Sequence, residues 1–242
     1  MKITLLFPRF TPGLALLSPP SPSTVEAQVW LIEIEAHAPL FDECLAILTP
    51  DEHSRVQRFH KTLDRQAFTL RRGLTRVILG SYLDLPPASL RFQPGPQGKP
   101  SLASPNPQKF QFNSSFSHNW IALGVIAGRS LGVDIQAGLA LDDLASVAQR
   151  TFSPRELIDY NTLSPTLQPA CFYQNWVRKE AYVKAVGLGM TIPFSEIDLA
   201  NPSSSPGSGM IIQVHGQPAP DWLLTDISAP PGYFGAVCIH YT

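Results

Sequence analysis

Two apolar segments that lie almost end to end in the middle of the chain limit most strongly how it can fold. Residues 121–127 and 131–135 are runs of mainly small and branched apolar residues, and only Gly128, Arg129 and Ser130 separate them. Apolar runs of this length, bounded by turn residues, are typical of buried β-strands. The short connection predicts that the two strands form a hairpin. The chain therefore needs a buried sheet near residue 130.

Helical patterns lie on both sides of this predicted sheet. Thr49, Pro50 and Glu52 form a helix start, because Thr49 can cap, proline suits the first helical position and Glu52 can close a capping box. The helical stretch runs to about Leu83, with a break near residues 60–62. The other expected elements are helices over 142–151, 154–160 and 170–186, and strands over 29–32, 90–92, 211–214 and 233–239.

Each half of the chain thus combines strands with a long helix, and no extended linker divides the halves. We therefore predict an α+β fold of two similar α/β halves, residues 1–130 and 131–242, packed against each other. The Pro- and Ser-rich segment 17–23 is expected to be a loop, and segment 203–209 a mobile loop. One chain that contains both halves is expected to be a monomer.

Composition excludes several classes of partner. The formal net charge is −1, so no overall basic field favours nucleic acid or an anionic membrane. The three cysteines are far apart and lack metal-ligand spacing, which fits a reduced compartment. The longest apolar stretch is too short to cross a bilayer, and the N-terminus lacks the pattern of a signal peptide. We expect a cytoplasmic protein.

The second apolar run contains a carboxylate, Asp134, between Val133 and Ile135. A buried, unpaired carboxylate is costly, so such an aspartate needs hydrogen bonds, a cationic partner or a metal ion. The alternative is an aspartate at the end of a strand, where its side chain turns to solvent or caps a helix. Taken alone, so short a motif favours the alternative.

A helical segment over residues 175–185 carries a second carboxylate. Trp176, Glu180 and Lys184 lie four residues apart and therefore share one face of the helix. A Glu–Lys pair at this spacing is often only a surface ion pair. Here the neighbouring Trp, Val, Tyr and Ala residues indicate a largely buried helix.

Two shorter segments carry weaker signals. Ser117 and His118 are adjacent, so on a strand they point to opposite faces and cannot form a nucleophile–base pair by adjacency. A histidine here is structural or exposed, or it donates a hydrogen bond to a phosphate oxygen. Gln97-Gly98-Lys99-Pro100 is a turn with one lysine, as any solvated loop can have.

Together and in this order, these segments resemble the Sfp-type 4′-phosphopantetheinyl transferase family. The Lys-Glu-Ala motif resembles the branch that includes broad-range and fatty-acid or cyanobacterial enzymes. The resemblance covers most of the chain. It runs through Pro50-Asp51-Glu52, Gly98-Lys99-Pro100, Phe116-Ser117-His118, Gly132-Val133-Asp134 and Trp176-Val177-Arg178-Lys179-Glu180-Ala181-Tyr182-Val183-Lys184.

The resemblance implies an enzyme, a holo-[acyl-carrier-protein] synthase, with the active site in the cleft between two similar halves. It would transfer the 4′-phosphopantetheine group from coenzyme A to a serine of an apo acyl or peptidyl carrier protein, releasing 3′,5′-ADP. The serine hydroxyl would attack the β-phosphorus of the pyrophosphate. Mg²⁺ is the implied metal, since it accepts carboxylates and waters and bridges phosphate oxygens.

The resemblance also implies roles for individual residues. Asp134 and Glu180 match the metal ligands, and Glu180, or a water that it holds, would act as the general base. Lys184 would neutralise or protonate the phosphate of the departing ADP. Positioning and charge stabilisation of this kind are the main requirements of phosphoryl-type transfer.

The remaining matches concern the coenzyme. Ser117 and His118 match positions that contact its phosphates, and His118 is also placed among the catalytic residues. Arg55 matches a basic position that holds the 3′-phosphate. Gly98 and Lys99 lie where the adenine end binds.

The chain departs from the family pattern at two positions. The family's commonest metal strand reads Asp-x-Glu, whereas Gln136 stands at the third position here and is a weaker magnesium ligand. Glu52 stands where some relatives carry a second basic contact to the coenzyme. The resemblance therefore leaves Arg55 as the one basic residue that would bind the 3′-phosphate end of the coenzyme. Arg72 and Arg76 are expected to be structural or to face the carrier.

An acidic carrier is expected to dock on the second half, over residues 136–155. The alternative is that the leucines of this stretch belong to the core. The contacts expected there are Leu139, Leu141, Leu144, Val147, Arg150 and Arg155.

Two rival functions remain open. One is another transferase that uses coenzyme A or a nucleotide on a similar fold. The other is a catalytically inactive module that binds coenzyme A or a carrier protein. Asp134, Glu180 and Lys184 argue against the inactive module, because a binding module needs no base.

Overall fold

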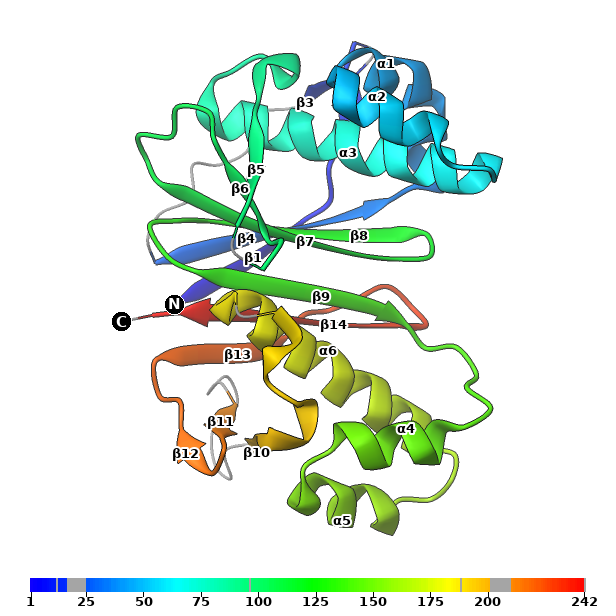
Figure 1. Ribbon diagram of the computed structural model, residues 1–242, viewed down its shortest axis with the longest axis vertical. Helices are drawn as coiled ribbons and strands as arrows, with labels where there is room; N and C mark the ends of the chain where they lie inside the picture. The colour runs from blue at the N-terminus through cyan, green and yellow to red at the C-terminus, as the bar shows by residue number, and fades with distance from the viewer. Residues whose placement is uncertain (12, 17–24, 96, 188, 201–209, 242) are drawn as a thin grey trace.

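A computed structural model describes the chain except for residues 12, 17–24, 96, 188, 201–209 and 242. The predicted loops over 17–23 and 203–209 therefore lie outside the described residues. The described part is an α+β fold of two halves, as predicted, and each half packs a long helix against a sheet (Figure 1). No helix of this part is long and apolar enough to cross a membrane.

The N-terminal half is built on a four-stranded sheet in the order β1-β4-β8-β7. Its strands are β1 (Lys2–Leu6), β4 (Glu26–Glu33), β8 (Trp120–Ala127) and β7 (Phe110–Ser117). β1 runs parallel to β4, and the other pairs are antiparallel. The remaining strands form two short pairs, β2 (Phe10–Thr11) with β3 (Ala15–Leu16) and β5 (Phe92–Pro94) with β6 (Pro100–Leu102).

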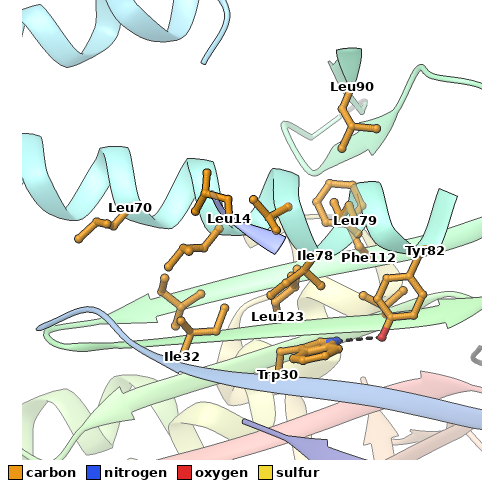
Figure 2. Packing of buried hydrophobic residues seen from close by; sticks show 14 of the residues in the cluster. Leu14, Trp30, Ile32, Leu70, Ile78, Leu79, Tyr82, Leu90, Phe112 and Leu123 are labelled. Carbon is orange, nitrogen blue, oxygen red and sulfur yellow. Dashed lines mark hydrogen bonds between the residues drawn. The ribbon is translucent and has the colours of Figure 1, made fainter. Parts of the chain in front are cut away.

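One long helix, α3 (Thr62–Leu83), covers a face of this sheet. Its buried side chains, among them Leu70 and Ile78, pack on Ile32 and Leu123 of the strands (Figure 2). The indole Nε1 of Trp30 donates a 2.8 Å hydrogen bond to the hydroxyl of Tyr82, which satisfies both polar groups inside the core. These contacts fix the position of α3 on the sheet.

The capping residues at the start of the first predicted helix behave as expected. Helix α2 (Pro50–Gln57) has Thr49 as its N-cap, and Thr49 and Glu52 form the reciprocal capping box. α2 ends before residue 60 and α3 begins at Thr62, so the predicted break is confirmed. The other helical turns of this half are η1 (Glu35–Leu40), α1 (Phe41–Ala46) and η2 (Pro87–Ser89).

The C-terminal half packs helix α6 (Gln168–Val186) against a three-stranded sheet in the order β13-β14-β9. These strands are β13 (Trp222–Asp226), β14 (Tyr233–His240) and β9 (Leu131–Ala137). The other elements are α4 (Leu144–Thr151), α5 (Pro154–Thr162), η3 (Gly189–Thr191), η4 (Phe194–Glu196), β10 (Ile197–Ala200), β11 (Ile211–Val214) and β12 (Gln217–Pro218).

The predicted hairpin near residue 130 is wrong in its pairing. Both strands exist and a short turn joins them, but β9 pairs with β14, where Asp134 lies opposite Ala236. β8 is bonded to β4 on one edge and to β7 on the other. Because both edges of β8 are occupied, β9 has to leave this sheet and find its partner in the C-terminal half.

Side chains, rather than a shared ladder, join the two sheets where β7 and β9 lie side by side. Asn113 Oδ1 accepts a hydrogen bond from the amide of Val133 at 2.9 Å, and Ser117 Oγ accepts one from the amide of Ala137 at 3.0 Å. Between them, Ser115 Oγ donates to Asp134 Oδ1 at 2.5 Å. Alternate residues of β7 thus satisfy the edge of β9 that β14 does not reach.

Gly132 permits the close packing of α6 on β9. A Cβ atom at this position would lie 2.1 Å from the carbonyl oxygen of Ala181 and 2.3 Å from the amide nitrogen of Ala185. These are backbone atoms of the helix, so no side-chain movement can relieve the contact. A residue without a side chain is therefore needed here, and α6 is held directly above the strand that carries Asp134.

We expect Gly132→Ala to destabilise the protein by about 1–3 kcal/mol, the usual cost of overpacking. The matched control is Gly124→Ala on β8, where the added Cβ would meet only the side chains of Leu131 and Val133. Urea unfolding should show the larger loss for Gly132→Ala. An equal or smaller loss would mean that α6 is not pressed against β9.

Candidate active site

Two carboxylates from different elements of the C-terminal half approach the same point. The ammonium of Lys184 lies 2.5 Å from Asp134 Oδ1 on β9 and 3.9 Å from Glu180 Oε2 on α6. It also donates to the hydroxyl of Ser115 on β7 at 3.2 Å. Asp134 is only 4% exposed, so the alternative of an aspartate that turns to solvent is wrong. The predicted helix face that brings Glu180 and Lys184 together is confirmed.

Burial controls the charge state of this cluster. Burial raises the pKa of Asp134, while the Lys184 ammonium and the Ser115 hydroxyl favour its charged form. Burial also raises the pKa of Glu180. The Lys184 ammonium acts against this rise, whereas the negative charge of Asp134 adds to it. Two carboxylates that are forced together away from water favour any cation that can sit between them.

The donor set fits a small, hard cation. Carboxylate and hydroxyl oxygens are the ligands that Mg²⁺ prefers, and it commonly uses one or two carboxylates together with substrate phosphates and water. Among the described residues no group of three or more His, Cys, Asp or Glu could hold a metal ion. The pair is therefore compatible with a magnesium site that is completed by a ligand from outside the chain.

Gln136 lies two residues beyond Asp134 on β9 and hence on the same face of the strand. Its side chain is half-buried and forms no hydrogen bond within the described part of the chain. Nothing in this geometry makes it a metal ligand, so its role stays a prediction.

A basic pocket of about 490 Å³ lies in the N-terminal half. α2 contributes Arg55, α3 contributes Arg71 and Arg72, the β5–β6 turn contributes Gly98, and β7 contributes Ser114. Ser114 precedes Ser115, which bonds Asp134. Neighbouring residues of a strand point to opposite sides, so β7 faces the pocket with Ser114 and the carboxylate pair with Ser115.

Two of the three guanidinium groups in this pocket have no carboxylate partner. Arg72 pairs with Glu52 and lies over the ring of Phe92, 4.3 Å from its centroid. Within the described residues, Arg55 and Arg71 form no ion pair, and they lie 5.1 Å and 5.8 Å from the centroid of Phe68. Unpaired guanidinium groups in a pocket are suited to bind a phosphate.

Arg71 is a candidate residue that the sequence interpretation missed. Burial lowers its pKa, and the charges of Arg55 and Arg72 lower it further. An anion in the pocket would relieve this repulsion. The sequence pattern shows the i,i+4 spacing of Arg72 and Arg76 on one helix. It does not show that Arg71 of α3 lies beside Arg55 of α2, which is the contact that makes Arg71 a candidate.

Arg76 is structural. It is only 1% exposed, and its guanidinium bonds Glu52 Oε2 at 2.9 Å and the carbonyl oxygens of Pro87 and Leu90 at 2.9 and 3.1 Å. Glu52 thus caps α2 and also pairs with two arginines. Because Arg76 is paired with Glu52, it adds no unpaired positive charge to the pocket.

The remaining predicted coenzyme contacts lie at the boundary of the halves. Ser117 is buried, and its Oγ lies 3.4 Å from Nδ1 of His118. His118 is exposed in the β7–β8 turn, with a left-handed φ of 49°. Gly98 lines the pocket, but the side chain of Lys99 leaves it, because its ammonium bonds carbonyl oxygens of the C-terminal half.

Comparison with known proteins identifies the family. The family model described as 4′-phosphopantetheinyl transferase superfamily matches residues 130–238, and the model described as 4′-phosphopantetheinyl transferase, N-terminal, matches residues 35–129. The chain is 31% identical over 229 residues to the 4′-phosphopantetheinyl transferase HetI of Nostoc sp., which covers 94% of this chain and 91% of that protein. This protein belongs to the 4′-phosphopantetheinyl transferase family.

Two further relatives agree. A putative 4′-phosphopantetheinyl transferase of Synechocystis sp. is 32% identical over 188 residues, which is 76% of either chain. The 4′-phosphopantetheinyl transferase Sfp of Bacillus subtilis is 25% identical over 194 residues, 80% of this chain and 83% of that protein. The membership predicted from the motifs is confirmed, whereas the branch within the family stays a prediction.

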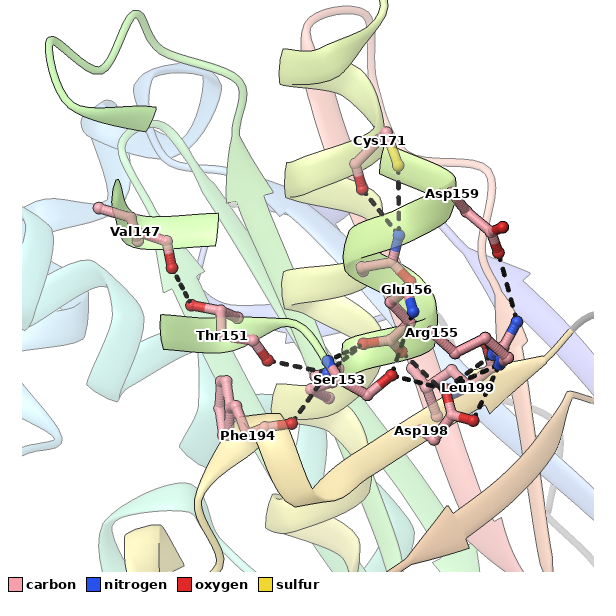
Figure 3. Close-up of polar contacts among 12 residues, drawn as sticks. Val147, Thr151, Ser153, Arg155, Glu156, Asp159, Cys171, Phe194, Asp198 and Leu199 are labelled. Atoms are coloured by element: carbon pink, nitrogen blue, oxygen red, sulfur yellow. Dashed lines mark hydrogen bonds and ion pairs between the residues drawn. The ribbon is translucent and has the colours of Figure 1, made fainter. Parts of the chain in front are cut away.

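In this phosphopantetheinyl transferase, a buried ion pair anchors the helix that carries Glu180. The neighbouring Lys179 is fully buried, and its ammonium bonds Glu156 Oε2 at 2.5 Å and the carbonyl oxygens of Thr151 and Phe194 at 2.9 and 2.8 Å. Figure 3 shows Glu156 among these groups, beside Ser153 and Leu199. The pair ties α6 to α4, α5, η4 and β10.

The expected carrier surface over 136–155 divides into two parts. Leu144 and Val147 are partly buried and pack against the aromatic cluster around Phe152, which agrees with the alternative that leucines of this stretch serve the core. Leu139 and Leu141 are exposed, at 48% and 44%. Of the expected cations, Arg150 is exposed, whereas Arg155 is engaged by Asp198 at 2.8 Å.

Lys179→Met should destabilise the phosphopantetheinyl transferase by about 3–5 kcal/mol, because it leaves Glu156 charged, buried and without its partner. The double variant Lys179→Met/Glu156→Gln should recover part of this loss in urea unfolding, since no buried charge remains. Lys2→Met removes an exposed ion pair with Glu26 and is the control that should change little. Equal losses in the single and double variants would contradict the anchor.

Proposed function

We propose that this protein transfers the 4′-phosphopantetheine group of coenzyme A to a serine of an apo acyl or peptidyl carrier protein and releases 3′,5′-ADP. Family membership supports the transfer and the enzyme class. The observation that carries the assignment of the site is the approach of Asp134 and Glu180 to one point, where a cation already sits. A non-catalytic binding module would have no need for this costly arrangement.

The basic pocket is the proposed seat of the phosphate groups at the nucleotide end of coenzyme A. Arg55 and Arg71 would bind the 3′-phosphate, because they are the guanidinium groups without a partner in the pocket. Gly98 would lie against the adenine. Ser114 lines this pocket and Ser115 bonds Asp134, so the pyrophosphate would extend past β7 from the pocket toward Asp134. His118, exposed at the end of β7, is placed to donate to a phosphate oxygen.

The reaction follows from these placements. Asp134 and Glu180 would hold Mg²⁺, which when bound supplies the positive charge that polarises the pyrophosphate oxygens. Glu180 would accept the proton of the carrier's serine hydroxyl as the oxygen bonds to the β-phosphorus. The bond from that phosphorus to the bridging oxygen breaks, and Lys184 would neutralise the phosphate of the departing 3′,5′-ADP.

The carrier would approach beside this site on the C-terminal half. Leu139 and Leu141 offer exposed apolar contacts, and Arg150 offers an exposed cation without an ion pair among the described residues. This surface suits a carrier that is acidic around its serine.

The decisive experiment mixes the protein with coenzyme A, Mg²⁺ and an apo carrier protein and weighs the carrier by mass spectrometry. Asp134→Asn and Glu180→Gln should each slow the mass gain by at least about 100-fold, within the range typical of general acid–base groups. Glu196→Gln, at an exposed carboxylate far from β9 in sequence, is the control and should keep its rate. Coenzyme A binding without any mass gain in the wild-type protein would favour the inactive binding module.

A second prediction concerns the cation that the free protein carries. The Lys184 ammonium contacts Asp134 and Glu180, the two residues that would hold Mg²⁺, so the ammonium and the metal would compete for the same carboxylates. Lys184→Met should therefore tighten Mg²⁺ binding without coenzyme A by roughly tenfold, equivalent to about 1.4 kcal/mol, while it lowers turnover. Calorimetry with Mg²⁺ alone measures the first effect, and Lys61→Met is the control. Weaker Mg²⁺ binding in Lys184→Met would overturn the competition.

A further inference from the structure

One lysine of the N-terminal half extends its side chain into the C-terminal half. Lys99 lies in the turn between β5 and β6, and its ammonium donates to the carbonyl oxygen of Leu131 at 2.8 Å and to that of Lys184 at 2.7 Å. Leu131 is the first residue of β9, and Lys184 lies in the last turn of α6. Within the described residues Lys99 forms no ion pair with a carboxylate.

The acceptors explain why a cation is suitable here. The carbonyl of Lys184 is one of the last four in α6 and has no amide partner in the helix. The negative end of the helix dipole also favours a positive charge at this place. Gly187 caps α6 with a left-handed φ of 78°, which turns the chain away, and a Cβ there would lie 3.9 Å from Cδ of Lys99. The lysine stem thus covers the end of the helix.

A second residue of the β5–β6 turn, Gln97, also lies against the segment that follows α6. A Cβ at Gly189 would lie 3.3 Å from Cβ of Gln97, so the segment after α6 lies against the β5–β6 turn. Gly98, between Gln97 and Lys99, lines the basic pocket. The β5–β6 turn therefore lines the pocket with Gly98 and contacts the end of α6 with Lys99.

We propose that Lys99 is a positioning residue that links the coenzyme pocket to β9 and α6, and so fixes the distance from the pocket to Asp134, Glu180 and Lys184. The proposal rests on the function proposed above, since it takes that pocket as the coenzyme site. It differs from direct contact with the coenzyme, for which the ammonium would have to face the pocket. Burial lowers the pKa of Lys99 to about 8, since within the described residues no carboxylate pairs with the ammonium to offset the loss of water.

The test compares Lys99→Met with Lys109→Met, which replaces an exposed lysine that follows the same β5–β6 region in the chain. In the free protein, without coenzyme or carrier, Lys99→Met should speed hydrogen exchange at the amides of residues 183–187 at least tenfold. Lys109→Met should leave it unchanged. In the transfer assay Lys99→Met should lower kcat at least tenfold, with less than a threefold change in the Kd for coenzyme A.

Lys99→Arg keeps a cation and several donors on a similar stem, so it should restore part of the exchange protection and of kcat. This variant keeps the test valid if Lys99→Met folds poorly. Unchanged exchange together with a tenfold or greater rise in the Kd for coenzyme A would overturn the proposal and make Lys99 a coenzyme ligand. If the wild-type protein modified no carrier, the proposed function would fail, whereas the exchange result would still decide whether Lys99 holds α6.

Discussion

The junction between β7 and β9 is the constraint on which the site depends. Each strand has one edge paired in its own sheet, and the facing edges are buried, so their polar groups need partners. Asn113 and Ser117 supply acceptors to the amides of β9, and Ser115 donates to Asp134. The side-chain bridges join the halves and place a carboxylate at their boundary.

From this junction the rest of the site is built by packing and charge. Gly132 lets α6 rest on β9, which brings Glu180 within reach of the same cation as Asp134. On the other side of β7, Arg55 and Arg71 form no ion pair within the described residues, although Asp51 and Glu52 also line the pocket. A region that attracts cations therefore adjoins a region that attracts anions. A pyrophosphate ligand that arrives with a metal ion would satisfy both, while either region alone remains electrostatically costly.

Local patterns in the sequence predicted the parts of this arrangement that are local in space. The capping residues gave the start of α2, and the four-residue spacing gave the face of α6 with Glu180 and Lys184. The pairing of β9 was mispredicted, because adjacency along the chain does not show that both edges of β8 are taken. Lys99 resembled a residue of a solvated turn, since its partners lie in the other half of the chain. What escaped prediction depends on contacts between segments that are separated along the chain, whether within one half, as for β9 and β14, or between the halves, as for Lys99.

The neutral side chain of Gln136 fits the charge balance of the site that contains Lys184. In the free protein the two carboxylates at the junction are faced by one ammonium, so the cluster is left with a small excess of negative charge. The Asp-x-Glu pattern of the family's commonest metal strand would add a third carboxylate two residues from Asp134, in a place that is already largely buried. Burial penalises each added charge, and one lysine could not balance three. A neutral glutamine adds no charge, so the Lys184 ammonium comes close to balancing the free site.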